Sequence, residues 1–180
     1  MTLHGRCVAL CAAMLVGACA VIPPVADALD GDTLTGRLAV RVEASESAPA
    51  RAVSAAFDLH GNASTGRLNL ATPLGSVLAQ ARWAPGSVVL ATPQGETQFP
   101  DLDALTREVL GESLPVAALF DWLRGRPWPG AASIATVAPA EAGFEQLGWV
   151  VNLARFDEAW VAAHRDAAPA VTVRARIDRP

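Results

Sequence analysis

Cysteine is scarce in this sequence and is confined to its N-terminal end. The chain has 180 residues, and its three cysteines are Cys7, Cys11 and Cys19. Everything that follows Cys19 therefore lacks a free thiol, a disulfide and a cysteine ligand for a metal. Zinc sites and redox chemistry that depend on cysteine are excluded from that part of the chain.

Positive charge is also limited, because the sequence contains no lysine. All 14 basic residues are arginine, and the net charge is −4. The arginines are spread along the chain and form no basic block of the kind that a nucleic-acid-binding surface needs. We therefore expect no nucleic acid partner.

The common catalytic motifs are absent as well. The sequence has no HExxH, G-x-S-x-G or CxxC motif and no glycine-rich phosphate loop after a strand. His60 and His164 lie outside the N-terminal segment, and neither has a ligand pattern around it. We predict a protein that is not an enzyme and that has no cofactor and no metal. The alternative, a hydrolase, requires a serine or a carboxylate beside one of these histidines.

The N-terminal segment has the pattern of a bacterial lipoprotein signal. Arg6 is followed by an apolar run, residues 7–18, that is too short to span a bilayer comfortably. The run ends in Val16-Gly17-Ala18-Cys19, where small residues precede a cysteine as in a lipobox. We predict a signal peptide at residues 1–18 and lipidation of Cys19. The alternative is an ordinary secretory signal with a chance cysteine.

The residues after Cys19 indicate where such a lipoprotein would reside. Ala20 stands where an aspartate would retain the protein at the inner membrane, so we predict an outer-membrane lipoprotein that faces the periplasm. Residues 20–32 are rich in proline, alanine and aspartate. We therefore expect a lipid-anchored tether at residues 19–32 and a folded domain at residues 33–180. Several acyl chains on one residue anchor a protein stably.

Apolar and polar residues alternate along most of this domain, as in half-buried strands. In residues 33–42, Leu38 and Val40 fall on one face, and Arg37 and Arg41 fall on the other. The alternation predicts strands near residues 33–42, 53–59, 67–71, 77–83, 87–92, 96–99, 144–156 and 169–177.

Helical spacing replaces the alternation between the sixth and seventh of these strands. Asp101 is placed as an N-cap and Gly111 as a stop, and a second helix begins near Pro115 and ends at Gly125. Residues 158–166 are expected to form a short helix or a loop. Strands with one apolar face must curve over another layer. We predict a mainly β (α+β) fold, an unclosed antiparallel β-barrel or half-barrel in which helices cap a hydrophobic cavity.

Large apolar side chains are abundant, and hydrophobic residues make up 52% of the chain. They could all fill a core, or the sheet and helices could leave an apolar cleft able to hold acyl chains. Strand alternation and helix spacing place the candidate lining residues on the inner face: Phe57, Leu68, Leu70, Val88, Leu90, Leu119, Trp122, Trp149 and Val151.

Three segments together resemble the LolB family of outer-membrane lipoprotein receptors. They are Thr72-Pro73-Leu74-Gly75-Ser76, the run LPVAALFDWLRGRP at residues 114–127, and GFEQLGW at residues 143–149. The resemblance implies an unclosed antiparallel β-barrel with helices over a hydrophobic cavity, in agreement with the pattern above. It also implies that lipoproteins are accepted from the periplasmic carrier LolA, through their acyl chains, and are inserted into the inner leaflet of the outer membrane.

The family has a protruding loop with an exposed leucine that acts in membrane insertion of the cargo. Its motif matches Pro73, Leu74 and Gly75 here, so the resemblance assigns this role to Leu74. A large apolar residue is unusual at a turn, where Asn, Asp or Ser is preferred.

We expect the protein to be a monomer. The competing interpretation is a structural or assembly lipoprotein that uses the curved sheet to bind proteins, and it predicts a filled core.

Overall fold

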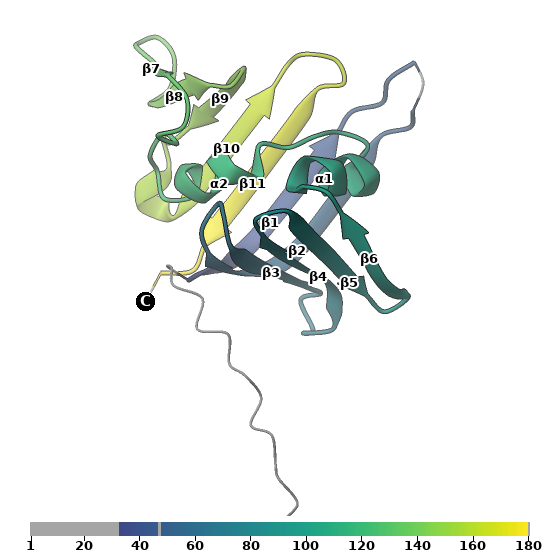
Figure 1. Cartoon of the computed structure of the whole chain (residues 1–180). Coiled ribbons are helices and arrows are strands. Elements are labelled where there is room, and N and C mark those ends of the chain that lie inside the picture. Colours follow the sequence, from purple (N-terminus) through teal and green to yellow (C-terminus); the bar gives the residue numbers. More distant parts are fainter. Residues whose placement is uncertain (1–32, 47, 180) are drawn as a thin grey trace, which may run out of the picture.

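An antiparallel sheet forms most of the protein over residues 33–46 and 48–179, which the computed structural model describes (Figure 1). Apolar alternation produces its strands: in the first strand Val40 and Val42 are buried and Arg41 is exposed. The strands are β1 (Leu34–Val42), β2 (Arg51–Gly61), β3 (Gly66–Ala71), β4 (Val77–Ala84), β5 (Ser87–Thr92), β6 (Gly95–Phe99), β7 (Ser133–Ala135), β8 (Gly143–Gln146), β9 (Trp149–Asn152), β10 (Trp160–Arg165) and β11 (Val171–Ile177).

The sheet is open, because its strand order runs from β6 at one edge to β7 at the other without closure. The order is β6-β5-β4-β3-β2-β1-β11-β10-β9-β8-β7. Most neighbours are consecutive hairpin strands, and the pairing of β1 with β11 joins the two ends of the domain. The sheet curves, and two helices lie on its concave side (Figure 1). The predicted unclosed antiparallel half-barrel with capping helices is confirmed.

The first helix, α1 (Leu102–Leu110), begins and ends where the sequence predicts. The carboxylate of Asp101 accepts a hydrogen bond of 2.7 Å from the backbone N–H of Ala104, which satisfies one of the free donors of the first turn. Gly111 ends the helix with a φ of 81°, a left-handed conformation that glycine adopts without steric cost. Arg51 of β2 donates to the carbonyls of Glu108 and Val109, so the C-terminus of α1 is fixed to the sheet.

The second helix, α2 (Val116–Trp122), is tied to both α1 and the sheet. The backbone N–H of Leu114, just before it, donates to the buried hydroxyl of Thr106 in α1 at 3.0 Å. At its other end the indole N–H of Trp122 donates to the side-chain oxygen of Gln146 in β8 at 2.8 Å. The helix itself is predicted correctly from Pro115, and Gly125 lies three residues beyond its last residue.

The core has two parts, one under each half of the sheet. We call the part under β1 and β7–β11 the filled core, because most of its apolar members are buried. We call the part under β2–β6 the open cluster, because most of its apolar members are only partly buried. The helices contribute to both, through Trp122 of α2 in the filled core and Leu105 and Phe120 in the open cluster.

Two predictions near the C-terminus are wrong. The expected helix or loop at residues 158–166 is a short 3-10 turn, Phe156–Glu158, followed by strand β10. Val161 and Ala163 of β10 point into the filled core, but the small alanines on both faces weaken the alternation in the sequence. The expected strand at residues 144–156 is instead the hairpin β8–β9, which reverses at Leu147 and Gly148. Strand β7 lies in an alanine-rich segment that carries no alternation.

The predicted signal peptide, the lipidation of Cys19 and the tether at residues 19–32 lie outside the described residues. Neither α1 nor α2 nor any other helix in the described part is long and apolar enough to cross a membrane. Over the same residues, no three His, Cys, Asp or Glu side chains are grouped so that they could hold a metal ion.

Candidate functional site

The open cluster contains five of the nine side chains predicted to line a cavity. Phe57 and Val88 are buried, with exposed fractions of 3% and 4%, and they form the floor of the cluster. Leu68, Leu70 and Leu90 are partly buried and pack against that floor. Register brings them together, because Leu70 lies opposite Phe57 on β2. The concave side of β2–β6 therefore carries a continuous apolar surface that retains accessible area.

The other four predicted residues lie in the filled core. Trp122, Trp149 and Val151 are nearly inaccessible, and the rings of Trp122 and Trp149 are 5.9 Å apart. Leu119 of α2 is partly buried against the same core. Aromatic rings at this separation interact directly and leave no room between them for another molecule. In this structure these side chains hold α2 against the sheet rather than lining open space.

Sequence reasoning missed several apolar side chains of the open cluster. Most come from the helices and from strand ends, where a short alternating pattern gives little information about direction, and Leu38 lies in the middle of β1. The partly buried members outside the predicted set are Leu34, Leu38, Phe99, Leu102, Val116, Leu123 and Ile177.

An aromatic pair joins helix α2 to the open cluster, to which Val116 of α2 also belongs. Phe120 packs edge to face against Trp83 of β4, with ring centroids 5.5 Å apart. The indole N–H of Trp83 donates to the carbonyl oxygen of Asn62 at 3.0 Å, so the ring is fixed from both sides. This pair anchors one side of the apolar surface.

The β3–β4 loop presents Leu74 almost completely to solvent. Its side chain is 96% exposed, the largest value among the exposed large hydrophobic residues described. The loop is a tight turn: the N–H of Gly75 donates to the carbonyl of Thr72, and the N–H of Thr72 donates to the carbonyl of Ser76, both at 2.9 Å. The Thr72 hydroxyl accepts from the N–H of Ser76 as well. A rigid turn therefore holds the leucine outward and keeps it from folding back onto the sheet.

Further apolar surface continues from this loop onto β4. Val77 and Leu78, the first two residues of that strand, are 62% and 40% exposed. Together with Leu74 they form an apolar tip, by which we mean these three side chains. Single exposed apolar residues are common on proteins, but three at one loop mark a contact surface more specifically.

His60 has neighbours that the sequence did not reveal. Its Nε2 lies 2.5 Å from a carboxylate oxygen of Asp58, and its Nδ1 lies 2.9 Å from the hydroxyl of Thr33. The signal available in the sequence was the spacing of two residues, which puts Asp58 and His60 on the same face of β2. His164 lies on β10, opposite Thr172 of β11 and Val150 of β9.

Fold and site together define the class of protein. It is an open antiparallel half-barrel with two helices on its concave side, an apolar surface beneath them, and a leucine held outward on a tight loop. Comparison with known proteins then gives the family.

Residues 33–175 match the family described as "Outer membrane lipoprotein LolB". The chain is 36% identical to the outer-membrane lipoprotein LolB of Bordetella parapertussis over 162 residues, which cover 86% of this chain and 80% of the relative. It is 35% identical to that of Bordetella petrii over 155 residues, 83% and 76% of the two chains. Identity to that of Cupriavidus pinatubonensis is 39% over 115 residues, 62% and 54% of the two chains.

The chain belongs to the LolB family. It is therefore an outer-membrane lipoprotein that acts as a receptor in lipoprotein localisation, and it is not an enzyme. The predictions of family, function and location are confirmed. The pair formed by His60 and Asp58 is consequently a feature of the outer sheet surface and not a hydrolytic centre.

Proposed function

We propose that the open cluster receives the acyl chains of a lipoprotein delivered by a LolA-like periplasmic carrier. The receptor then inserts that lipoprotein into the inner leaflet of the outer membrane. The observation that carries this proposal is the position of Leu74, which is 96% exposed at the end of the same half of the sheet that carries the partly buried apolar surface.

The apolar surface of the open cluster suits an acyl chain on energetic grounds. Each CH₂ group kept out of water contributes about 0.8 kcal/mol to binding at an apolar site, so transfer from carrier to receptor requires only a higher affinity at the receptor. Leu68, Leu70 and Leu90 retain accessible area that such a chain would cover. Covalent chemistry is not required at any step of this transfer.

Leu74 would act on the membrane rather than on the cargo site. Burying one leucine side chain among lipid acyl chains is worth about 1.5–3 kcal/mol, which favours contact but does not anchor a protein. Val77 and Leu78 enlarge the apolar tip. Lipidation of Cys19 would supply the stable attachment, and the tip would bring the cargo into the leaflet.

A transfer assay tests this function. The mature chain carrying Cys19→Ala is mixed with a carrier loaded with a lipoprotein, and cargo transfer is followed for three forms: unmodified, Leu74→Glu and Val137→Glu. Val137 is a matched control, because it is also exposed, at 76%, but lies outside the β3–β4 loop. All three forms should accept cargo. In lipid-anchored forms, only Leu74→Glu should lose delivery into vesicles.

Two outcomes would contradict the proposal. Failure of the unmodified chain to take cargo would remove the acceptor role and favour a protein-binding assembly lipoprotein. Equal loss of delivery in Leu74→Glu and Val137→Glu would remove the specific role of the loop while leaving the acceptor role intact.

A further inference from the structure

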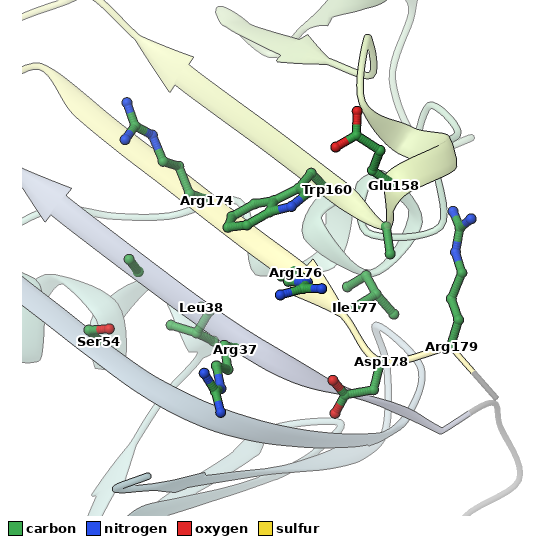
Figure 2. Close-up of a pocket in the computed structure, with 12 residues that line it drawn as sticks. Arg37, Leu38, Ser54, Glu158, Trp160, Arg174, Arg176, Ile177, Asp178 and Arg179 are labelled. Carbon is green, nitrogen blue, oxygen red and sulfur yellow. The ribbon is translucent and has the colours of Figure 1, made fainter.

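A hollow lies on the convex face of the sheet, opposite the open cluster. It has a volume of about 770 Å³ and lies over β1, β11 and β10 (Figure 2). Small side chains create it, since Ala39 of β1 and Ser54 of β2 lie opposite each other in the register and both line it. Larger side chains from the neighbouring rows surround this floor.

Arginines and one tryptophan form the surroundings of the hollow. Figure 2 shows Arg37, Arg174 and Arg176 with Trp160, carried by the three neighbouring strands. Arg37 lies directly opposite Arg176 in the β1–β11 register, and Arg176 lies opposite Trp160 in the β10–β11 register. Like charges directly opposite each other on one sheet face repel, so this arrangement is unfavourable unless an anion lies between them.

These three arginines differ from five others in the protein that are paired with a carboxylate. In the described part of the chain, no ion pair is formed by Arg37, Arg174 or Arg176. The arginines that do form ion pairs with carboxylates are Arg41, Arg82, Arg126, Arg155 and Arg165.

The acidic residues at the hollow do not cancel this charge. Glu158 is held 2.6 Å from Arg155, and the hydrogen bond and charge of that guanidinium lower the pKa of Glu158. Its negative charge is thus already matched within its own pair. Asp178 contributes one further carboxylate at the rim. Arg179 also lines the hollow and donates to the backbone carbonyls of Phe156 and Asp157. Four guanidinium groups beside one unmatched carboxylate leave the hollow positively charged.

Trp160 presents an apolar ring to the hollow, and two guanidinium groups lie beside that ring. The guanidinium carbons of Arg155 and Arg176 lie 5.5 and 5.9 Å from the centre of its ring. Tryptophan combines an apolar ring with one polar N–H, which suits the boundary between head groups and acyl chains. Arginine presents a planar fork of donors that matches a phosphate group in two-point geometry.

The position of the hollow relates it to the apolar tip. The residues Val77, Ala71, Ala56, Arg37, Arg176 and Trp160 form one continuous cross-strand row on the convex face. At about 4.8 Å per strand, Arg37 lies roughly 14 Å from Val77 along this row. A membrane surface that receives the tip could therefore also reach the arginines.

We propose that Arg37, Arg174, Arg176 and Trp160 form a phosphate-binding site that takes the head group of a membrane phospholipid. The site faces away from the acyl-chain acceptor and does not depend on it. Its role is to orient the convex face on the leaflet when the tip makes contact. Arg37, Arg174 and Arg176 would bind the phosphate, and Trp160 would pack beside it.

The test is co-sedimentation of the mature Cys19→Ala chain with phosphatidylethanolamine vesicles that contain or lack phosphatidylglycerol. Arg37→Gln, Arg174→Gln and Arg176→Gln should each weaken binding to the anionic vesicles about fivefold, the effect of one arginine near such a surface. Arg41→Gln is the matched control, since it removes the same charge from the same face of β1 but from an existing ion pair. It should change binding less than twofold.

Four further measurements sharpen the result. Arg176→Lys keeps the charge but loses the fork, so it should restore only part of the binding. Salt should weaken binding of the unmodified chain. The melting temperature of Arg176→Gln should change little, because the substitution relieves the repulsion with Arg37 but also removes the contact with the Trp160 ring. Binding by Leu74→Glu should still depend on Arg176, which separates the head-group site from the tip.

The proposal is overturned if Arg41→Gln weakens binding as much as Arg176→Gln, since the effect would then be general charge. It is also overturned if inorganic phosphate changes Trp160 fluorescence while the anionic vesicles do not bind, because the ligand would then be a free anion. Cargo transfer from carrier to receptor involves no vesicle, so neither outcome would bear on the proposed acceptor function.

Discussion

At the scale of single residues, two leucines stand where turn chemistry favours other residues. Leu74 is held outward by the hydrogen bonds of its turn, and Leu147 occupies the reversal of the β8–β9 hairpin with a φ of 54°. Leu74 contributes little to stability, because its side chain is almost completely exposed. Leu147 is strained by its left-handed backbone conformation, which a residue with a Cβ atom and a bulky side chain adopts at a cost.

The strain at Leu147 leads to a stability prediction. Leu147 and Gly148 both have positive φ, as in the two-residue turns that prefer Asn-Gly. Leu147→Asn should therefore stabilise the protein by about 1 kcal/mol, which corresponds to roughly 2–4 °C in melting temperature for a chain of this size. Thermal unfolding followed by circular dichroism measures it, with Leu74→Asn as the control that should shift the transition little. A lower melting temperature for Leu147→Asn would show that the leucine side chain packs productively.

His60 provides a second residue-scale prediction. Its contacts with Asp58 and Thr33 resemble those of a hydrolytic site, although the family is one of receptors. His60→Ala should leave cargo transfer from the carrier unchanged within about twofold, because no proton transfer occurs in the proposed function. The transfer assay described above makes the comparison. A loss of transfer in a variant that remains folded would indicate that His60 takes part in the function.

At the scale of elements, the link between α2 and β8 depends on one buried amide. Gln146 is 2% exposed, and its oxygen accepts from the Trp122 indole N–H and from the backbone N–H of Trp128. Its nitrogen donates to the carbonyls of Trp128 and Ala131, each at 2.7 Å. The full hydrogen-bonding capacity of one side chain thus joins the helix, the following loop and the sheet.

Replacing this amide should be costly. Gln146→Leu leaves several buried donors and acceptors without a partner, which we expect to destabilise the protein by about 3 kcal/mol. The melting temperature should fall by roughly 6–12 °C. Gln98→Leu, on the exposed edge strand β6, is the control and should change the free energy of unfolding by less than about 0.5 kcal/mol. Equal effects from the two substitutions would mean that the amide does not hold α2 in place.

Elements also mark the limit of what the sequence predicts. Long alternating segments such as β1 and β11 are predicted well, because one face is buried and the other carries arginine. Strands β7 and β10 are missed, because alanine is compatible with helix, strand and loop.

The division of the cavity residues between the open cluster and the filled core could not be predicted from alternation. Alternation indicates which face of a strand is apolar, but not what packs against that face. The convex hollow was missed for a related reason: it depends on cross-strand register, which brings Arg37 and Arg176 together from opposite ends of the domain.

At the scale of the whole molecule, the two faces of one curved sheet have different chemistry. The concave side carries the open cluster and the helices, and the convex side carries the arginine hollow. The β3–β4 loop extends from the half that contains the open cluster. This arrangement places the proposed acceptor surface, the apolar tip and the head-group site on one continuous sheet.

The most direct test of this account asks whether acyl chains enter the open cluster. All three cysteines lie at or before Cys19, so a mature chain with Cys19→Ala accepts a single new cysteine for labelling. A polarity-sensitive fluorophore is attached at Leu90→Cys on the concave side or at Gln98→Cys on the outward face nearby, and each form is mixed with a lipoprotein-loaded carrier. The account predicts a blue shift at position 90 and none at position 98. Equal responses at both positions, or no response at position 90 while cargo is transferred, would contradict it.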